Sequence, residues 1–454
     1  MFRRIQYARQ LQAVGWVLPA VLSVTALLLA LPFLRAQDKP VIAIQGGIVL
    51  TMAGDAIEGG TVVMWQGKIA AVGKQVSIPD GAQIIDATGK YVMPGIVDAM
   101  TYYGIRPFAL NDRAKPVTPE NKVILAYYPF GKRMHGEKGI VKDQEILSGG
   151  VTTVYIAPGD QQVIGGQGAV VKTYGADYEA FTLREPAAID MCIGDPPKQE
   201  PRYIGAKPPL TRMGIATLLR KALVGAQQYE QKLKDYDQKS DEEKEKASPP
   251  PRTLDMEALI KLLNKDIPAR IESDFVDDIR TAIRICDEFD IDLVIDSGLG
   301  AYKVKDILAE KKIPVVLGPP IHPFVQGGEV SMTPDLYREM DDYNATKLLK
   351  AGVPVALASF GFSFGGFGYA TSGRWLLLEA AYLTGFNVSD EDALKMITIN
   401  AAQILGVADR VGSLEKGKDA DVIILDGYPL HIKTWVDQVF IDGENVYTRK
   451  GGAK

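Results

Sequence analysis

The sequence has few cysteines and few histidines, and it has no excess of positive charge. Two cysteines, Cys192 and Cys286, among 454 residues exclude a small domain held together by several disulfides. Two buried thiols and a Cys192–Cys286 bridge both remain open, because spacing alone does not show how close two cysteines lie. A formal net charge of -5 gives no reason to expect the basic surface that nucleic-acid binding requires. The length is ample for a large buried core and more than one compact unit.

The N-terminal region has the pattern of an export signal. Arg3, Arg4 and Arg9 precede an uncharged apolar run at residues 13–34, and polar sequence begins after it. A basic start, an apolar run and a small residue, Ala36, are typical of a signal peptide. A run of about 20 apolar residues is also long enough to span a bilayer as a retained anchor. With either outcome for residues 1–37, we expect the body to be exported to a periplasmic or extracellular location.

Two β-rich segments flank a long centre that alternates strands with helices. The segments 38–92 and 408–452 contain short Val-, Ile- and Thr-rich runs broken by turns such as Asp-Gly, which is typical of strands and hairpins. Residues 93–407 alternate apolar runs such as "VTTVYIAP" and "VPVALASF" with helical stretches such as "DDIRTAIRICDEFD". This alternation predicts an α/β fold with parallel βα units, and the length suits a (βα)8 TIM-like barrel. An open doubly wound sheet is the alternative.

Two stretches of the centre differ from this pattern. Residues 226–253 form an insertion with a mixed charge run that ends in prolines, which predicts a solvated helix followed by a stiff loop. "VIGGQGAVV" is a glycine-rich stretch, read here as a loop. It lacks the following Lys-Ser/Thr of a phosphate-binding loop.

The C-terminal part resembles the amidohydrolase superfamily. The stretch "TINAAQILGVADRVGSLEKGKDAD" matches the family pattern of "T-x-N-x-A-x-x-L-G" followed by "G-S-L-x-x-G-K-D-A-D". "YVMPGIVDAMTYYG" and "SGGVTTVY" are similar to its first two barrel strands. The resemblance covers about residues 40–450 and is closest to the imidazolonepropionase-like and prolidase-like branch. It implies a barrel with a small composite β-sandwich built from both chain ends.

The resemblance also implies where metal ligands would lie. In the family, a His-x-His pair ends the first strand, two histidines and an aspartate follow on later strands, and zinc or another divalent metal activates water. The corresponding positions of the first, fifth, sixth and eighth strands are Met100, Tyr102, Glu272, Ser297 and Phe360. These five positions depart from the family pattern, so the sequence predicts no metal cofactor at this site.

The histidine count supports this interpretation without any alignment. The chain holds three histidines, His135, His322 and His431, and His431 lies in the C-terminal β segment. Two histidines cannot supply a site that normally uses four. Part of the family carries a metal-bound lysine on the fourth strand, for which Lys172 in "GAVVKTYG" is the nearest candidate.

Other side chains could still form a site. Glu272 and Asp274 are two residues apart in a strand and so face one side, and with Asp98 they could make an oxygen-rich site for a hard cation. Carboxylates that are satisfied by backbone amides and by nearby Arg or Lys side chains are the favoured alternative. His322 follows the seventh strand, and a loop histidine held by backbone hydrogen bonds is favoured over a general base or a lone ligand. The aromatic segment 360–369 could fill the mouth of the barrel or bind a partner.

These observations lead to two hypotheses for the function. The preferred one is an exported pseudoenzyme, a non-catalytic subunit or binding module that forms a homo-oligomer or associates with a related active amidohydrolase. The alternative is an active hydrolase of carbon–nitrogen bonds that uses Glu272, Asp274, His322 and Asp98. In both, contact with the membrane is limited to the N-terminal segment.

Overall fold

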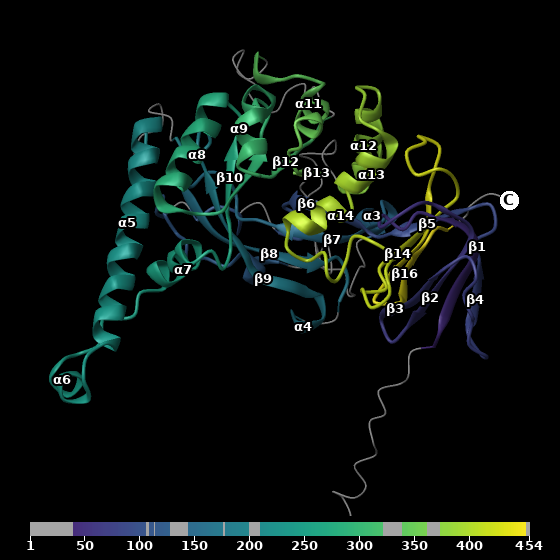
Figure 1. The fold of residues 1–454 in the computed structure, drawn as a ribbon, viewed down its shortest axis with the longest axis horizontal. Coiled ribbons are helices and arrows are strands. Elements are labelled where there is room, and N and C mark those ends of the chain that lie inside the picture. The colour runs from purple at the N-terminus through teal and green to yellow at the C-terminus, as the bar shows by residue number, and fades with distance from the viewer. Residues whose placement is uncertain are drawn as a thin grey trace, which may run out of the picture.

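The computed structural model describes residues 40–105, 109–112, 114–127, 144–175, 178–198, 209–320, 338–360 and 373–450. These residues form a barrel sheet with helices packed around it and a second sheet beside it (Figure 1). No helix among these residues is long and apolar enough to cross a bilayer. The N-terminal segment 1–37, predicted as a signal peptide or anchor, lies outside the described residues.

The barrel sheet contains eight strands in the order of the chain. They are β6 Ile96–Thr101, β7 Val151–Ile156, β8 Ile164–Lys172, β9 Thr182–Cys192, β10 Ala269–Ser273, β11 Leu293–Ser297, β12 Val315–Leu317 and β13 Val355–Leu357. Almost every residue in them is buried, as expected for strands covered on both faces. The first and last strands meet where the Phe360 amide donates to the Met100 carbonyl at 3.0 Å. The predicted TIM-like barrel is therefore confirmed.

One strand departs from the parallel pattern. β8 pairs antiparallel with both β7 and β9, while the other neighbours in this sheet are parallel. The glycine-rich stretch at 163–171, read as a loop, is thus mostly strand β8. Lys172 at its end lies opposite Thr153 near the start of β7, which is the end of the barrel remote from the mouth. The suggestion that Lys172 could be a metal-bound lysine is wrong, because the reversed strand carries it to the opposite end.

Helices and 3-10 turns connect and cover the strands. The helices are α3 Gln144–Ser148, α4 Tyr178–Phe181, α5 Arg212–Asp237, α6 Asp241–Lys246, α7 Leu254–Leu263, α8 Val276–Phe289, α9 Lys305–Glu310, α11 Asn344–Lys350, α12 Leu376–Thr384, α13 Asp390–Met396 and α14 Ile399–Ile404. The 3-10 turns are η2 Val123–Ala126, η3 Ala301–Val304 and η5 Gly373–Trp375. Figure 1 shows α8, α9, α11 and α12 following one another around the outside of the barrel.

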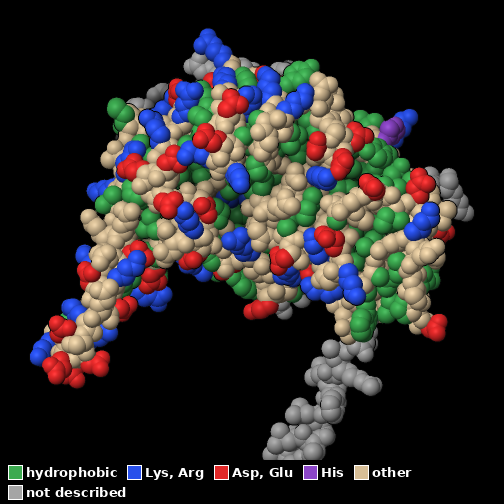
Figure 2. Space-filling model, in the orientation of Figure 1, with side chains coloured by type: hydrophobic (Ala, Val, Ile, Leu, Met, Phe, Trp, Pro, Cys, Tyr) green, Lys and Arg blue, Asp and Glu red, His purple; other side chains and the backbone are tan. Residues whose placement is uncertain are grey.

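The charged insertion forms an arm. α5 is 26 residues long and extends away from the body, with α6 at its tip (Figure 1). α6 has no buried residue and begins with a capping box of Ser240 and Glu243. Figure 2 shows Lys, Arg, Asp and Glu side chains covering this tip. The predicted solvated helix is therefore present.

The second sheet joins both ends of the chain. Its strands are β1 Ile42–Val49, β2 Ile57–Trp65, β3 Lys68–Gly73, β4 Gln83–Asp86, β5 Tyr91–Pro94, β14 Val422–Leu425, β15 Val436–Ile441 and β16 Glu444–Thr448. β14 lies next to β5, so the C-terminal strands continue the N-terminal ones. Positive φ values at Asp442 and Gly443 give the tight turn that the Asp-Gly pair predicted between β15 and β16. The domain limits proposed from sequence remain predictions.

A buried ion cluster joins the barrel to the second sheet. The Lys172 ammonium, which is fully buried, lies 2.8 Å from Asp419, 3.0 Å from Asp421 and 2.5 Å from Asp442. Asp419 also pairs with Lys68 and Arg410. The surrounding carboxylates raise the pKa of Lys172 despite its burial, and the cations lower the pKa of Asp419. Lys172 and Asp419 are therefore compensated, whereas burial raises the pKa of Asp421 to about 6 and its Oδ2 has no hydrogen-bond partner among the described residues.

We expect the substitution Lys172→Met to destabilise the protein strongly. It leaves Asp419 and Asp421 buried without their main cation, which costs about 3–5 kcal/mol in buried ion pairs. Urea unfolding measures the loss. Lys68→Met is the matched control, because the Lys68 side chain is 49% exposed and its pair contributes less than about 1 kcal/mol. If the two substitutions lowered the free energy of unfolding equally, Lys172 would not be the main cation of the cluster.

Candidate functional site

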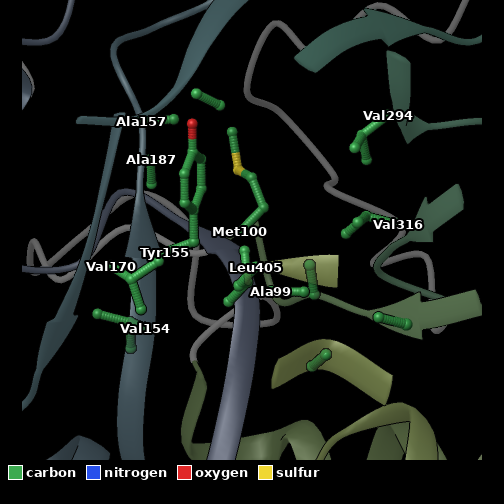
Figure 3. Close-up of a cluster of buried hydrophobic side chains, with 14 of the residues drawn as sticks. Ala99, Met100, Val154, Tyr155, Ala157, Val170, Ala187, Val294, Val316 and Leu405 are labelled. Carbon is green, nitrogen blue, oxygen red and sulfur yellow. The ribbon is translucent and has the colours of Figure 1, made fainter. Parts of the chain in front are cut away.

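The mouth of the barrel is lined by the carboxyl ends of the parallel strands, where the sites of such barrels lie. Met100 on β6 is buried, and Figure 3 shows its thioether alongside the Tyr155 ring in the apolar interior. Tyr102, just beyond β6, is also buried. Glu272 lies on β10 and Ser297 ends β11, while Phe360 follows β13. The structure thus places all five sequence-predicted positions at strand ends of the barrel.

Three carboxyl groups that are largely shielded from water gather on one side of the mouth. Glu272 lies close enough to Asp160 and Asp274 for their charges to interact. Burial and these neighbouring carboxylates raise the pKa of Glu272 well above its usual value. Burial raises the pKa of Asp274 to about 6, although the Ser297 hydroxyl donates a hydrogen bond to it. The predicted proximity of Glu272 and Asp274 is therefore observed, with Asp160 as an additional member.

Asp98 lies apart from this group. It accepts hydrogen bonds from the Ser359 amide at 2.9 Å and from the Ser359 hydroxyl at 2.5 Å. Its charge acts on Glu379 of α12, which is buried and has no hydrogen-bond partner for either oxygen among the described residues. Burial raises the pKa of Asp98 to about 6 and that of Glu379 well above its usual value. Asp98 therefore joins the first and last strands, and among the described residues it forms no group with Glu272 and Asp274 that is arranged to hold a metal ion.

A polar layer lies beneath the mouth. Arg270, two residues before Glu272 on β10, pairs with Asp296 through Nε and Nη2 at 2.9 and 2.6 Å. Its guanidinium lies 3.9 Å from the centre of the Tyr155 ring. The Tyr155 hydroxyl donates to Asp190, whose pKa burial raises to about 8. The one buried cation of this layer is thus paired with Asp296, and its charge also opposes the rise in the pKa of Asp98 and Asp190.

The backbone is strained at two of the strand ends. Ser297 has a φ of 67° and Phe360 a φ of 46°, both in the left-handed region that residues other than glycine rarely adopt. Such outliers cost about 1–3 kcal/mol each and cluster at functional sites. Strain at Ser297 and Phe360 therefore marks the mouth as the candidate site.

The described donors do not fit a divalent transition metal. Among the residues described, no group of three or more His, Cys, Asp and Glu side chains is arranged to hold a metal ion. A thioether, a phenol and a phenyl ring at Met100, Tyr102 and Phe360 are poor or impossible ligands for zinc. His322 and His135 lie outside the described residues, as does the aromatic segment beyond Phe360. His431 lies on an exposed loop between β14 and β15.

The cysteines are free and buried. Cys192 ends β9 at the mouth, and Cys286 lies on α8, so no disulfide joins them. Burial and nearby carboxylates raise the pKa of Cys192 well above its usual value, and burial raises that of Cys286 to about 12. A thiol that does not ionise is a poor nucleophile, which argues against cysteine catalysis.

Sequence reasoning missed four members of the interior. Their positions are Asp160, Asp190, Arg270 and Glu379. Arg270 could have been found from its position two residues before Glu272, since alternate residues of a strand face one side. Glu379 carries no such signal, because an acidic residue in a helix is usually exposed.

The comparisons with known proteins decide the family. A family model described as Amidohydrolase family matches residues 327–446. A solved amidohydrolase from Thermotoga maritima MSB8 is 33% identical, is covered over 100% of its chain and 90% of this one, and superposes with a TM-score of 0.77. This chain belongs to the amidohydrolase family.

Two curated amidohydrolase relatives match more distantly. "Amidohydrolase tasK" from Hapsidospora irregularis is 24% identical over 85% of this chain and 39% of its own length. An imidazolonepropionase from Thermoplasma volcanium is 31% identical over 27% of this chain and 31% of its own. This chain therefore spans about two-fifths or less of the length of these curated relatives. Together with the solved structure, they confirm the resemblance seen in the C-terminal motif.

The raised pKa of Asp190 predicts a stability that falls as the pH rises. An unfolded Asp titrates near pH 4, whereas Asp190 in the folded protein titrates at about 8, so the folded state binds more protons between these values. Its contribution to stability is complete below about pH 4 and declines towards pH 8. We expect Asp190→Asn, which mimics the protonated acid, to flatten this decline in urea unfolding between pH 4 and pH 8. An unchanged slope would show that Asp190 is ionised in the folded protein.

Proposed function

We propose that this amidohydrolase-family protein is an exported, non-catalytic subunit or binding module. The observation that carries the proposal is the set of side chains at the strand ends of the mouth. Met100, Tyr102, Ser297 and Phe360 stand where the family resemblance places metal ligands, and none of them is an imidazole or a carboxylate. In the family a metal activates water near neutral pH, and the residues at these four positions offer no suitable ligand for it.

The carboxyl groups of the mouth do not replace the missing ligands. Glu272 and Asp160 have raised pKa values because each is buried, and Glu272 also lies near other acids. Asp274 is bonded to Ser297 and Asp98 to Ser359, so their oxygens are already engaged. A protonated or engaged carboxyl group binds a cation weakly. These groups are better suited to binding a ligand through hydrogen bonds than to holding a metal.

The proposal includes location and association. The basic residues and apolar run within residues 1–37 support export to the periplasm or the outside of the cell, with residues 13–34 cleaved or retained as an anchor. Association with a related active amidohydrolase, or with a second copy of itself, gives a reason for a well-formed barrel without the usual ligands. Homologous surfaces can preserve a two-fold interface between related chains.

A second candidate function is a hydrolase of carbon–nitrogen bonds that uses carboxyl groups alone. The observation that favours it is the pKa of about 6 at Asp274, which lies near the range in which a general base works best. In this reading Glu272 would supply a proton and Asp274 would remove one.

We expect purified protein to hold well under one equivalent of zinc, manganese or iron, because the described donor set does not fit these metals. Elemental analysis of the protein after dialysis measures this. A stoichiometric metal that is lost in Glu272→Gln or Asp274→Asn would overturn the proposal and identify those residues as ligands.

Activity assays separate the two candidate functions. We expect no turnover of amides, cyclic amides or dipeptides above a buffer blank. If turnover is found, Glu272→Gln and Asp274→Asn decide its origin, and Asp277→Asn on the exposed surface of α8 is the matched control. Loss of turnover in the first two variants but not in the control would establish the carboxylate hydrolase.

A further inference from the structure

Glu379 is enclosed by the protein without a bonding partner. It lies on the buried face of α12 together with Leu376, Ala380 and Leu383, and its side chain is 1% exposed. Neither of its carboxyl oxygens has a hydrogen-bond partner among the described residues. A charge in such a position would lose its hydration and gain no counter-charge in return. Glu379 is therefore enclosed as the neutral acid.

The turn η5 brings the start of α12 against the first barrel strand. A Cβ atom added at Gly373, the first residue of η5, would lie 3.1 Å from Asp98 Oδ2, so η5 packs directly on Asp98. Side chains of a helix lean towards its N-terminus, so Glu379 leans from α12 towards η5. The charge of Asp98 accordingly acts on Glu379. The two acids therefore belong to one buried region beneath η5 and α12.

Hydrogen bonds decide which of the two acids keeps a proton. Asp98 accepts hydrogen bonds from the Ser359 amide at 2.9 Å and from its hydroxyl at 2.5 Å, and the charge of Arg270 also favours the ionised form of Asp98. No described residue gives such help to Glu379. Hydrogen bonds to a carboxylate lower its pKa, whereas burial alone raises the pKa of a carboxyl group. Glu379 therefore keeps its proton to a higher pH than Asp98.

This buried region lies at the seam that closes the barrel. Ser359 and Phe360 directly follow the last strand, β13. Ser359 donates to Asp98 on β6, and the Phe360 amide donates to the Met100 carbonyl. The packing of η5 on Asp98 thus covers the point where the first and last strands meet.

We propose that Glu379 is a proton-dependent latch on the barrel seam. With its proton, Glu379 allows η5 and α12 to close over Asp98. Without it, the carboxylate of Glu379 is stable only in water and is repelled by ionised Asp98, so η5 and α12 move away from the seam. The latch involves no catalytic step, and the proposal therefore does not rest on the proposed function.

The other ionisable groups around η5 and α12 are exposed or bonded elsewhere. Asp341 pairs with Lys347, and Arg374 lies 4.8 Å from the centre of the Trp375 ring. The charged residues of the adjoining helix α13 (Figure 1) bond to Tyr428, to Ser389 or to one another. The groups concerned are Glu145 on α3, Arg374 on η5, Asp341 and Asp342 before α11, Asp390, Glu391, Asp392 and Lys395 on α13, and His431 between β14 and β15. Among the described residues, Asp98 is the charged group that acts on Glu379.

Hydrogen exchange measured by mass spectrometry tests the latch in the full chain, kept in detergent because of residues 13–34. An opened latch releases the proton of Glu379, so opening should increase by roughly tenfold per pH unit between the ordinary pKa of a glutamic acid and that of the closed form. We therefore expect peptides of η5 and α12 to lose protection as the pH rises from 7 to 9, after correction for the intrinsic exchange rate. Peptides of β10 and β11 should keep most of their protection.

Substitutions assign this pH dependence to one side chain. Glu379→Leu places an apolar group in an apolar site, and Glu379→Gln keeps the shape of the side chain without a charge. Both should make the protection of η5 and α12 independent of pH, and either variant suffices if the other does not fold. Glu391→Gln is the matched control, because Glu391 is exposed on α13 and pairs with Lys395. His431→Gln is a second control on the outer side of α12. Both controls should retain the pH dependence of the unsubstituted chain.

Three results would overturn the proposal. The first is protection of η5 and α12 that does not change between pH 7 and pH 9 in the unsubstituted chain. The second is a pH dependence that persists in the Glu379 variants or disappears in His431→Gln, which would assign it to another group. The third is an equal loss of protection in β10 and β11, which would show that the whole barrel unfolds and that no local latch opens.

Discussion

The burial of one ammonium group determines how the two sheets are joined. Lys172 stands at the end of the reversed strand β8, and its charge is fully removed from water. The three aspartates around it come from the C-terminal segment, two before β14 and one in the turn between β15 and β16. A buried charge is tolerated only when its counter-charges are in place. The barrel and the second sheet are therefore held in the one arrangement that brings the three aspartates to Lys172. The antiparallel direction of β8 and the Asp-Gly turn are both needed for it.

The interior of the barrel carries an unusual amount of acid for a packed core. Asp98, Asp190, Glu272 and Glu379 all have raised pKa values, and burial is the main cause in each case. Protonation removes most of the penalty for enclosing them, so the core remains compact at the expense of stability at higher pH. A metal ion would offset the same charges in a different way.

Much of the fold could be predicted from sequence, because it depends on local patterns. Apolar runs of the right length marked the parallel strands, and Asp442-Gly443 marked a hairpin. The direction of β8 could not be predicted, since an apolar run reads the same in both directions and its neighbours are set by tertiary contacts. For the same reason Lys172 was misplaced. In the site, the alternation of a strand predicted that Glu272 and Asp274 lie together. The separation of Asp98 depends on Ser359, a residue far away in the chain.

The composite sheet has a consequence for how the chain folds. β5 pairs with β14, although more than two-thirds of the chain separates these two strands. Closing so long a loop is slow compared with forming the hairpins between β7, β8 and β9, which are neighbours in sequence. During synthesis the edge of β5 that pairs with β14 therefore remains unpaired until the C-terminal residues have been made. If the chain is exported with its N-terminus first, as proposed, this sheet would close only after the whole polypeptide had passed through the membrane.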